Sequence, residues 1–143
     1  MANQSKNRVK LNRKYRNIGF ISVDALKLIR KVYNKVPKDA KYIRVNGGNA
    51  VKHNIDHLRG IKTALDRLGL TNEGYAEYVA RNYTEIYKGN VDESLLLVVR
   101  TDSTHHLAAV HLDYDKNENF WLVTSVHPVR DNDIKIDDFI WMK

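Results

Sequence analysis

Hydrophobic residues recur along the first part of the chain with a helical period. Between residues 22 and 36, apolar side chains stand about three residues apart, from Val23 to Val32, so one face of a helix would be apolar. Ser22 precedes this run and is a favourable N-cap, because its hydroxyl can accept a hydrogen bond from a free amide of the first turn. The pattern predicts a helix that begins after Ser22 and ends before Pro37.

The pattern up to residue 90 predicts two short extended segments and two further helices. Residues 18–21 form a strand or turn that leads into the first helix, and Tyr42–Val45 forms a strand followed by an Asn-Gly-Gly-Asn turn. A helix is expected from Asn49 to Gly69, with a possible break at Gly60. Another helix is expected to end at Gly89, with Thr71 or Asn72 as its cap and these apolar residues on one face: Tyr75, Tyr78, Val79, Tyr83 and Ile86.

After residue 90 the hydrophobic period becomes that of strands. Leu95–Arg100 is a continuous apolar run that ends in a charge, as in a buried strand. Leu107–Tyr114 and Phe120–His127 flank a polar loop and predict a hairpin, and residues 131–143 predict a final strand or short helix. The sequence therefore predicts an α+β fold in which N-terminal helices pack on a C-terminal antiparallel sheet.

Length and composition favour one soluble domain preceded by a basic arm. The chain of 143 residues fits a single domain, and no apolar run is long enough to cross a membrane. The absence of cysteine excludes disulfides, thiolate metal sites and cysteine nucleophiles. Residues 1–17 are rich in Lys and Arg and are expected to form a flexible arm or the end of a linker, and residues 18–143 are expected to form the domain.

Charge is distributed unevenly along the chain. Residues 1–62 contain 16 Lys and Arg against three acidic residues, whereas the remainder is acidic overall. A basic half favours contact with a polyanion such as nucleic acid, although a solvated basic tail has the same composition. If RNA is the partner, these cations are expected to bind its backbone: Lys41, Arg44, Lys52, Arg59 and Lys62.

The segment around His53 and His57 carries the first candidate chemistry. Residues four apart share one face of a helix, and this face points away from the apolar stripe. Imidazole can accept and donate protons near neutral pH, and the neighbouring cations would attract a phosphate. Two surface histidines and two ligands of a zinc ion are alternative interpretations. The residue after His53 is Asn54 and not the Glu of the metalloprotease pattern, so we expect no metal.

The predicted hairpin and its flanks carry further candidates. Strand alternation would place Leu122, Thr124 and Val126 on one face, and Val123, Ser125 and His127 on the other, so only one of the two hydroxyls would line a site. Arg100 and Arg130 could stabilise a phosphorane, because a guanidinium binds phosphate oxygens in a fork. His127 is the best further candidate for an acid or base, whereas His105 and His106 are typical of a solvent-facing loop.

These features together resemble a known family of nuclease domains. The chain is similar to the phage-associated nucleases of the barnase–EndoU–colicin–RelE (BECR) superfamily, which occur in polymorphic toxins and at the end of phage head-morphogenesis proteins. The resemblance covers about residues 18–134 and rests on five segments: Ile18–Ile21 before a helix, His53 and His57 in their helix, Asn82–Asn90, the strand ending at Arg100, and Trp121–Arg130.

The resemblance implies a metal-independent endoribonuclease toxin that cleaves RNA, such as tRNA, to a 2′,3′-cyclic phosphate. It implies an antiparallel sheet with helices on one side, no cofactor, an immunity protein or antitoxin as partner, and action in the bacterial cytoplasm, with delivery as part of a larger, phage-encoded protein. The residues that match the family's catalytic pattern are His53, His57, Arg100 or Arg130, and Thr124 or Ser125. A nucleic-acid-binding phage protein without catalysis and a protein-binding inhibitor remain alternatives.

Overall fold

The computed structural model describes residues 15–46, 68–69, 72–102 and 104–143. His53, His57, Lys52, Arg59 and Lys62 lie outside the described residues. The described elements, in chain order, are β1 (Tyr15–Phe20), α2 (Val23–Val32), β2 (Tyr42–Asn46), α5 (Asn72–Asn82), β3 (Glu85–Lys88), β4 (Ser94–Val99), β5 (His105–Asp115), β6 (Glu118–Val129), the short 3-10 helices η1 (Asp131–Asp133) and η2 (Ile136–Asp138), and β7 (Phe139–Met142).

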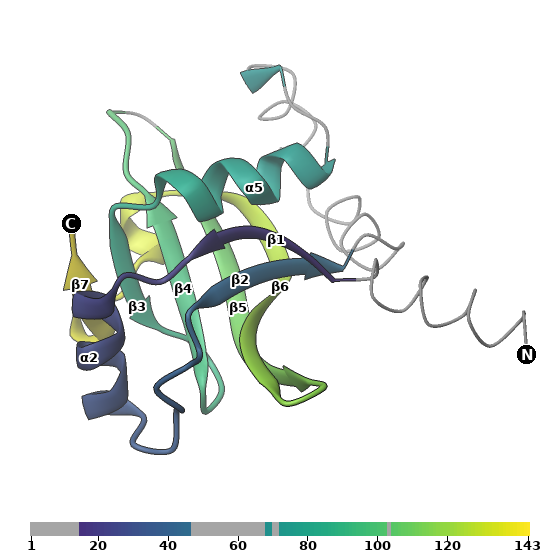
Figure 1. The fold of residues 1–143 in the computed structure, drawn as a ribbon. Helices are drawn as coiled ribbons and strands as arrows, with labels where there is room; N and C mark the ends of the chain where they lie inside the picture. Colours follow the sequence, from purple (N-terminus) through teal and green to yellow (C-terminus); the bar gives the residue numbers. More distant parts are fainter. Residues whose placement is uncertain (1–14, 47–67, 70–71, 103) are drawn as a thin grey trace, which may run out of the picture.

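The described strands form one mixed sheet in the order β1-β2-β6-β5-β4-β3-β7 (Figure 1). Every pair is antiparallel except β2 and β6, which run parallel. The α+β class is confirmed. The prediction of a purely C-terminal antiparallel sheet is wrong, because β1 and β2 form an antiparallel pair that adds to the edge of β6.

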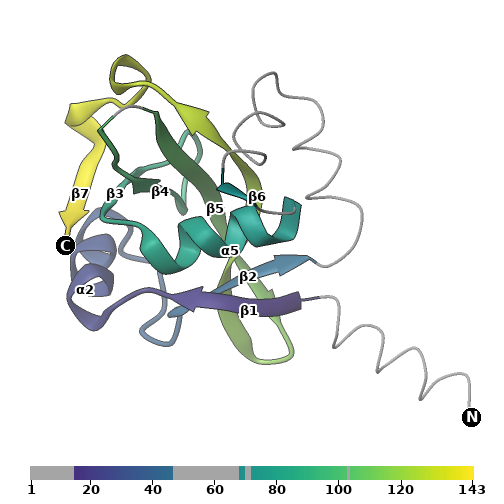
Figure 2. The ribbon, with the colours of Figure 1, turned by 90° about the horizontal axis from the view of Figure 1, so that it is seen from above.

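Both described helices pack into the core on one side of the sheet. In Figures 1 and 2, α5 crosses the sheet and α2 lies beside β7, as their contacts also show. The predicted Ser22 cap is confirmed, since its hydroxyl accepts a hydrogen bond from the amide of Ala25 at 3.2 Å. Close packing of α5 on β1 depends on Gly19, where a Cβ would lie 2.8 Å from the carbonyl oxygen of Ala80.

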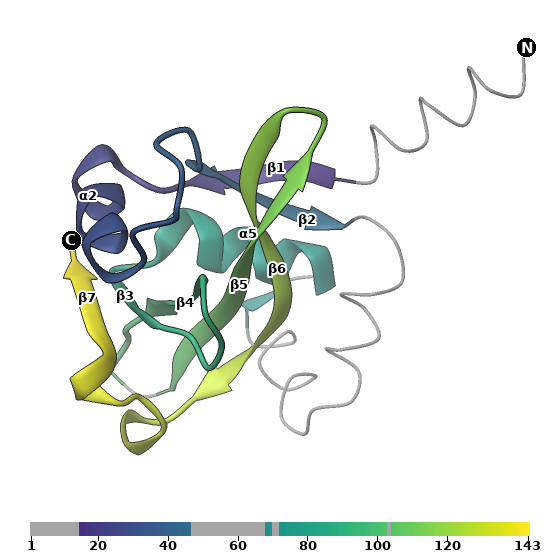
Figure 3. The same ribbon diagram turned by 90° about the horizontal axis from the view of Figure 1, so that it is seen from below.

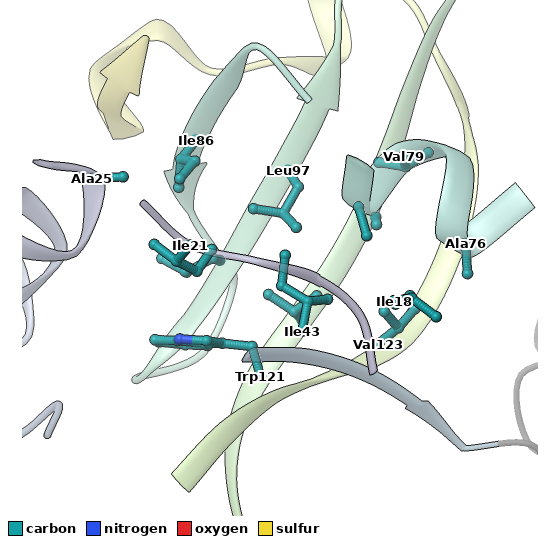
Figure 4. Close-up of a cluster of buried hydrophobic side chains, with 14 of the residues drawn as sticks. Ile18, Ile21, Ala25, Ile43, Ala76, Val79, Ile86, Leu97, Trp121 and Val123 are labelled. Carbon is teal, nitrogen blue, oxygen red and sulfur yellow. The ribbon is translucent and has the colours of Figure 1, made fainter. Parts of the chain in front are cut away.

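The main hydrophobic core lies between the sheet and these helices (Figure 4). Its largest side chain is Trp121 of β6, which is fully buried. The Trp121 indole N–H donates a hydrogen bond of 2.8 Å to the carbonyl oxygen of Ala40. Ile18 and Ile43 belong to the same cluster and bring the β1–β2 pair into the core. Trp121 therefore joins the β5–β6 hairpin to the chain segment that leads into β2.

The helix predicted up to Gly89 is shorter than expected, and a strand was missed. Helix α5 ends at Asn82, and Glu85–Lys88 form β3 between β4 and β7. Ile86 fits the helical spacing of the preceding apolar residues, but it is buried in the core from a strand. The competing interaction is pairing with two strands that come later in the chain, which favours an extended backbone here.

A β-bulge in β6 changes which side chains share a face. Ala109 pairs with Ser125, whereas the next residue, Val110, pairs with Val123, so Thr124 is the extra residue. Val123 and Val126 consequently both reach the core below the helices. The predicted simple alternation is therefore wrong between these positions.

The first strand begins before the predicted domain boundary. Tyr15 pairs with Asn46, and Arg16 forms a 2.8 Å ion pair with Glu77 of α5. Residues 15–17, which were expected to belong to the basic arm, are therefore part of the sheet.

Candidate active site

The candidate site lies on the face of the sheet opposite α2 and α5, called here the open face. Residues that pair directly across strands point to the same face, so the register places His105, Leu107 and Val129 there together. A small apolar cluster of Tyr87, Val98, Leu107 and Val129 covers part of this face, and Ile134 packs on it. Seen from below, β3 to β6 lie on the near side of α5 (Figure 3).

Arg100, just after β4, is the centre of a polar cluster at one end of the open face. Its guanidinium donates two hydrogen bonds to the Glu85 carboxylate, at 2.6 Å from Nε and 2.8 Å from Nη2. Its Nη1 lies 2.6 Å from Oδ1 of Asp131. The hydroxyl of Tyr87 donates to Glu85 and accepts a hydrogen bond from Arg100. Glu85 and Tyr87 therefore hold one side of the guanidinium, and its Nη1 projects toward Asp131.

His105 is the fourth partner in this cluster, and its hydrogen bonds define its tautomer. The backbone N–H of Thr101 donates to Nδ1 at 3.0 Å, so Nδ1 is an acceptor. The proton of the neutral ring then lies on Nε2, which is 2.6 Å from Oδ1 of Asp131. The 3.4 Å separation between Nε2 and Nη1 of Arg100 therefore brings two donors side by side. Both donors converge on the same carboxylate oxygen.

The electrostatics of the cluster keep Glu85 and Arg100 in their charged forms. Hydrogen bonding to Arg100 is the main cause that lowers the pKa of Glu85, despite the opposing effect of burial. The same hydrogen bonds raise the pKa of Arg100. Burial, together with the neighbouring Glu85, raises the pKa of the Tyr87 hydroxyl, which therefore keeps its proton. At neutral pH the cluster contains a cation fixed by a buried carboxylate.

Sequence reasoning found Arg100 and missed its partners. Glu85, Tyr87, His105 and Asp131 come from β3, β5 and η1, and the sheet brings them to Arg100. The interpretation of His105 and His106 as a solvent-facing pair is wrong, because both side chains are buried in β5. The sequence does show polar and charged residues at the ends of its apolar runs. This composition alone does not tell which of these residues lie next to one another in the sheet.

His106 lies on the helix side of the sheet and belongs to the core. Its Nδ1 is 2.7 Å from the hydroxyl of Tyr75, a residue of α5. Burial, helped by the nearby His105, lowers the pKa of His106, so the neutral ring accepts a hydrogen bond from the Tyr75 hydroxyl. Burial also raises the pKa of Tyr75, which keeps that hydroxyl protonated. This pair fixes α5 to β5 and takes no part in the open face.

We expect His106 to make the fold sensitive to mild acid. A histidine whose pKa is lowered by folding binds its proton more tightly in the unfolded chain, so its contribution to stability is complete above the ordinary pKa of 6.5 and is lost as the pH falls below it. Chemical denaturation between pH 7.5 and 5 should show a falling free energy of unfolding. The double variant Tyr75→Phe/His106→Leu should show a smaller fall over this range. An equal fall in both proteins would contradict this assignment.

The other predicted site residues have varied positions. Ser125 and His127 pair with Ala109 and Leu107 and lie together on the open face, whereas Val123, which was predicted to share their face, lies in the core. Thr124 lies in the bulge, and its hydroxyl donates to the carbonyl of Ala109 at 3.2 Å. Arg130 is exposed immediately before η1. Of these candidates, His127 is the strongest, because its register position is diagonal to His105.

The tautomer of His127 differs from that of His105. Its Nδ1 lies 3.2 Å from the carbonyl oxygen of Pro128 and donates to it, since a carbonyl can only accept. The neutral ring therefore carries an acceptor at Nε2. Diagonal neighbours on adjacent antiparallel strands have Cβ atoms roughly 7 Å apart. The two imidazoles therefore lie close enough for one small ligand to contact both.

Of the predicted RNA-binding residues, the structure describes Lys41 and Arg44. Lys41 is exposed, and its Nζ lies 5.4 Å from the centre of the Tyr42 ring. Arg44 is buried, donates to Asn17 and Glu118, and lies over the ring of Phe120. It pairs in register with Leu122 and shares the open face with it. Arg44 therefore offers less free charge to a ligand than its sequence position suggested.

Within the described part of the chain, no group of three or more His, Asp or Glu side chains is arranged to hold a metal ion. The helices in the same part are too short or too polar to cross a membrane.

Comparisons with known proteins found no match for this chain. No family model, no curated protein and no solved structure is significantly similar to it.

Proposed function

We propose that this protein is a metal-independent endoribonuclease that cleaves RNA by attack of a 2′-hydroxyl on the adjacent phosphate. The observation that carries the proposal is the convergence of two fixed donors, Nη1 of Arg100 and Nε2 of His105, on one oxygen atom of Asp131, each at 2.6 Å. Two such donors suit a phosphoryl oxygen that gains charge in the transition state.

Arg100 supplies the positive charge for this step. Because Glu85 holds Nε and Nη2 of the guanidinium, Nη1 is already oriented before a substrate arrives. Preorganised donors cost no rearrangement when charge develops on the phosphorane. His105 donates through Nε2, and the Thr101 amide prevents the ring from presenting its unprotonated nitrogen instead. Arg100 and His105 therefore bind charge, and proton transfer falls to other groups.

His127 is a residue on the open face that suits proton transfer. Its Nδ1–H is used by the Pro128 carbonyl, so Nε2 can accept the proton of a 2′-hydroxyl. A second group must protonate the leaving 5′-oxygen, so that the bond from phosphorus to that oxygen breaks as the bond to the 2′-oxygen forms. His53 and His57, predicted from the sequence and outside the described residues, remain the candidates for this acid. The products would be a 2′,3′-cyclic phosphate and a free 5′-hydroxyl.

The direct test is incubation of the protein with total tRNA in the presence of EDTA. We expect cleavage that leaves cyclic phosphate ends. His127→Gln should lower kcat by about a hundredfold or more, the usual contribution of one proton transfer. Arg100→Lys should lower kcat at least about tenfold, because an ammonium cannot reproduce the fork of a guanidinium. Arg81→Lys is the matched control, since Arg81 is an exposed arginine on α5 that pairs with Glu77.

Three outcomes would contradict the proposal. A gel shift without cleavage would favour a nucleic-acid-binding protein. Neither binding nor cleavage would favour the inhibitor interpretation. Activity that EDTA abolishes and zinc or magnesium restores would favour a metal-dependent mechanism.

A further inference from the structure

We infer that the carboxylate of Asp131 is a displaceable occupant of an oxyanion site, and that the phosphate of a ligand must replace it on Arg100 and His105. The inference rests on the proposed function only in naming an RNA phosphate as the natural ligand. The site itself is defined by Nη1 of Arg100 and Nε2 of His105, which both lie 2.6 Å from Oδ1 of Asp131.

The three side chains differ greatly in exposure. The side chain of His105 is 4% exposed, whereas that of Asp131 is 80% exposed. Arg100 is intermediate, at 36%. Asp131 also belongs to η1, a single short turn after the end of β6. The donors Arg100 and His105 are thus held at the sheet. The acceptor, the Asp131 carboxylate, lies at the surface, where a change of side-chain rotamer moves it into water.

The donors stay in position without Asp131. Glu85 binds Arg100 through two hydrogen bonds, and Tyr87 binds both of these residues. The Thr101 amide holds the ring of His105 through Nδ1. The main-chain N–H of Ile134 donates to the carbonyl of Asp131 and closes the η1 turn, and the Ile134 side chain packs on the apolar cluster of the open face. Loss of the carboxylate would therefore expose two oriented donors rather than disorganise them.

The chemistry of the two donors defines the ligand class. A guanidinium N–H and an imidazole N–H that meet at one point bind a single anionic oxygen, and phosphate presents several such oxygens around one centre. A carboxylate attached to the same chain has a high effective concentration at the site, so it competes with any free anion. Asp131 therefore reduces the affinity of the site for phosphate, and only a ligand with further contacts, such as a polynucleotide, displaces it readily.

Titration with inorganic phosphate tests this inference without any need for catalysis. The reporters are the NMR signals of the Arg100 Nε–H and of the His105 ring. Asp131→Ala should bind phosphate at least about tenfold more tightly than the wild type, which corresponds to about 1.4 kcal/mol. Asp131→Asn should show a smaller gain, because its amide oxygen still accepts a hydrogen bond but carries no charge.

Asp137→Ala is the matched control. Asp137 is an exposed acid on the neighbouring turn η2, so its removal changes the net charge equally. We expect less than about a twofold change in its phosphate affinity, because exposed charges at longer range are screened. Equal gains for Asp131→Ala and Asp137→Ala would reduce the effect to net charge and overturn the inference. Unchanged phosphate affinity in both Asp131 variants would also overturn the inference.

The result can be separated from that of the nuclease assay. Tighter phosphate binding by Asp131→Ala together with no RNA cleavage by any form would support the oxyanion site and reject the endoribonuclease. Cleavage by the wild type with no change in phosphate affinity in the Asp131 variants would support the endoribonuclease and reject the displaceable role of Asp131. Because Asp131 is mostly exposed, both variants are expected to melt close to the wild type, and their melting curves verify this.

Discussion

Arg100→Ala is expected to lower the free energy of unfolding by about 3 kcal/mol, because it leaves a buried carboxylate without its cation. The Glu85 side chain is only 9% exposed, and Arg100 supplies two of its hydrogen bonds. The measurement is denaturant unfolding at pH 7. The Ala variant would retain Tyr87 as the remaining donor to Glu85, which is too little to solvate a buried charge.

A double variant separates the pair from the packing around it. Glu85→Gln/Arg100→Met removes both charges at similar volume and should recover most of the loss, since no buried carboxylate is then left without a cation. If the double variant were as unstable as Arg100→Ala, the loss would come from packing and not from the unpaired carboxylate.

The pH dependence of the same pair has a defined sign. Folding lowers the pKa of Glu85 from its ordinary value of 4.5, chiefly through Arg100. The resulting stability is present above pH 4.5 and is lost as the pH falls through the lower pKa of the folded state. The difference in free energy of unfolding between the wild type and Glu85→Gln should therefore shrink as the pH falls below 4.5.

Trp121→Ala should be even more damaging, with a loss of about 4 kcal/mol, as is usual for removal of a large buried aromatic side chain. Trp121 is fully buried and also donates to the carbonyl of Ala40, which would be left without that hydrogen bond. Because the indole connects β6 to the segment before β2, the loss should appear as global unfolding in thermal or denaturant melts.

Two comparisons isolate the causes of this loss. Trp121→Phe keeps most of the apolar contact but removes the indole N–H, so it should cost about half as much or less. Leu122→Ala is the neighbouring control, because Leu122 is half-buried and faces the opposite side of the sheet. A loss for Leu122→Ala that equals the loss for Trp121→Ala would show that β6 is sensitive at every position and would contradict this account of the core.

Local signals in the sequence were sufficient for several elements. Ser22 stands before a helical spacing and is the observed cap. The apolar run that ends at Arg100 is β4, and the polar loop between two alternating runs is the turn of the β5–β6 hairpin. In each case the residues that form the element are adjacent in the chain, so local preference and tertiary packing favour the same structure.

The features that were missed depend on residues distant in sequence. Glu85–Lys88 continue a helical spacing, and only pairing with β4 and β7 makes them a strand. The bulge at Thr124 is a property of register and not of composition. For the same reason Arg100 could be singled out as a strand-end cation, whereas its partners Glu85 and Asp131 could not be assigned to it.

The parallel contact between β2 and β6 also determines when the sheet can be completed. Residues Tyr42–Arg44 pair with Phe120–Leu122, so the β1–β2 pair is synthesised long before the strand that it joins. Until then the free edge of β2 offers unpaired backbone donors and acceptors to other chains. Pairing across such a sequence separation slows folding, because the entropy of closing a long loop is lost before the contacts form. We therefore expect wrong pairing at this edge to remain a risk until β6 has been synthesised.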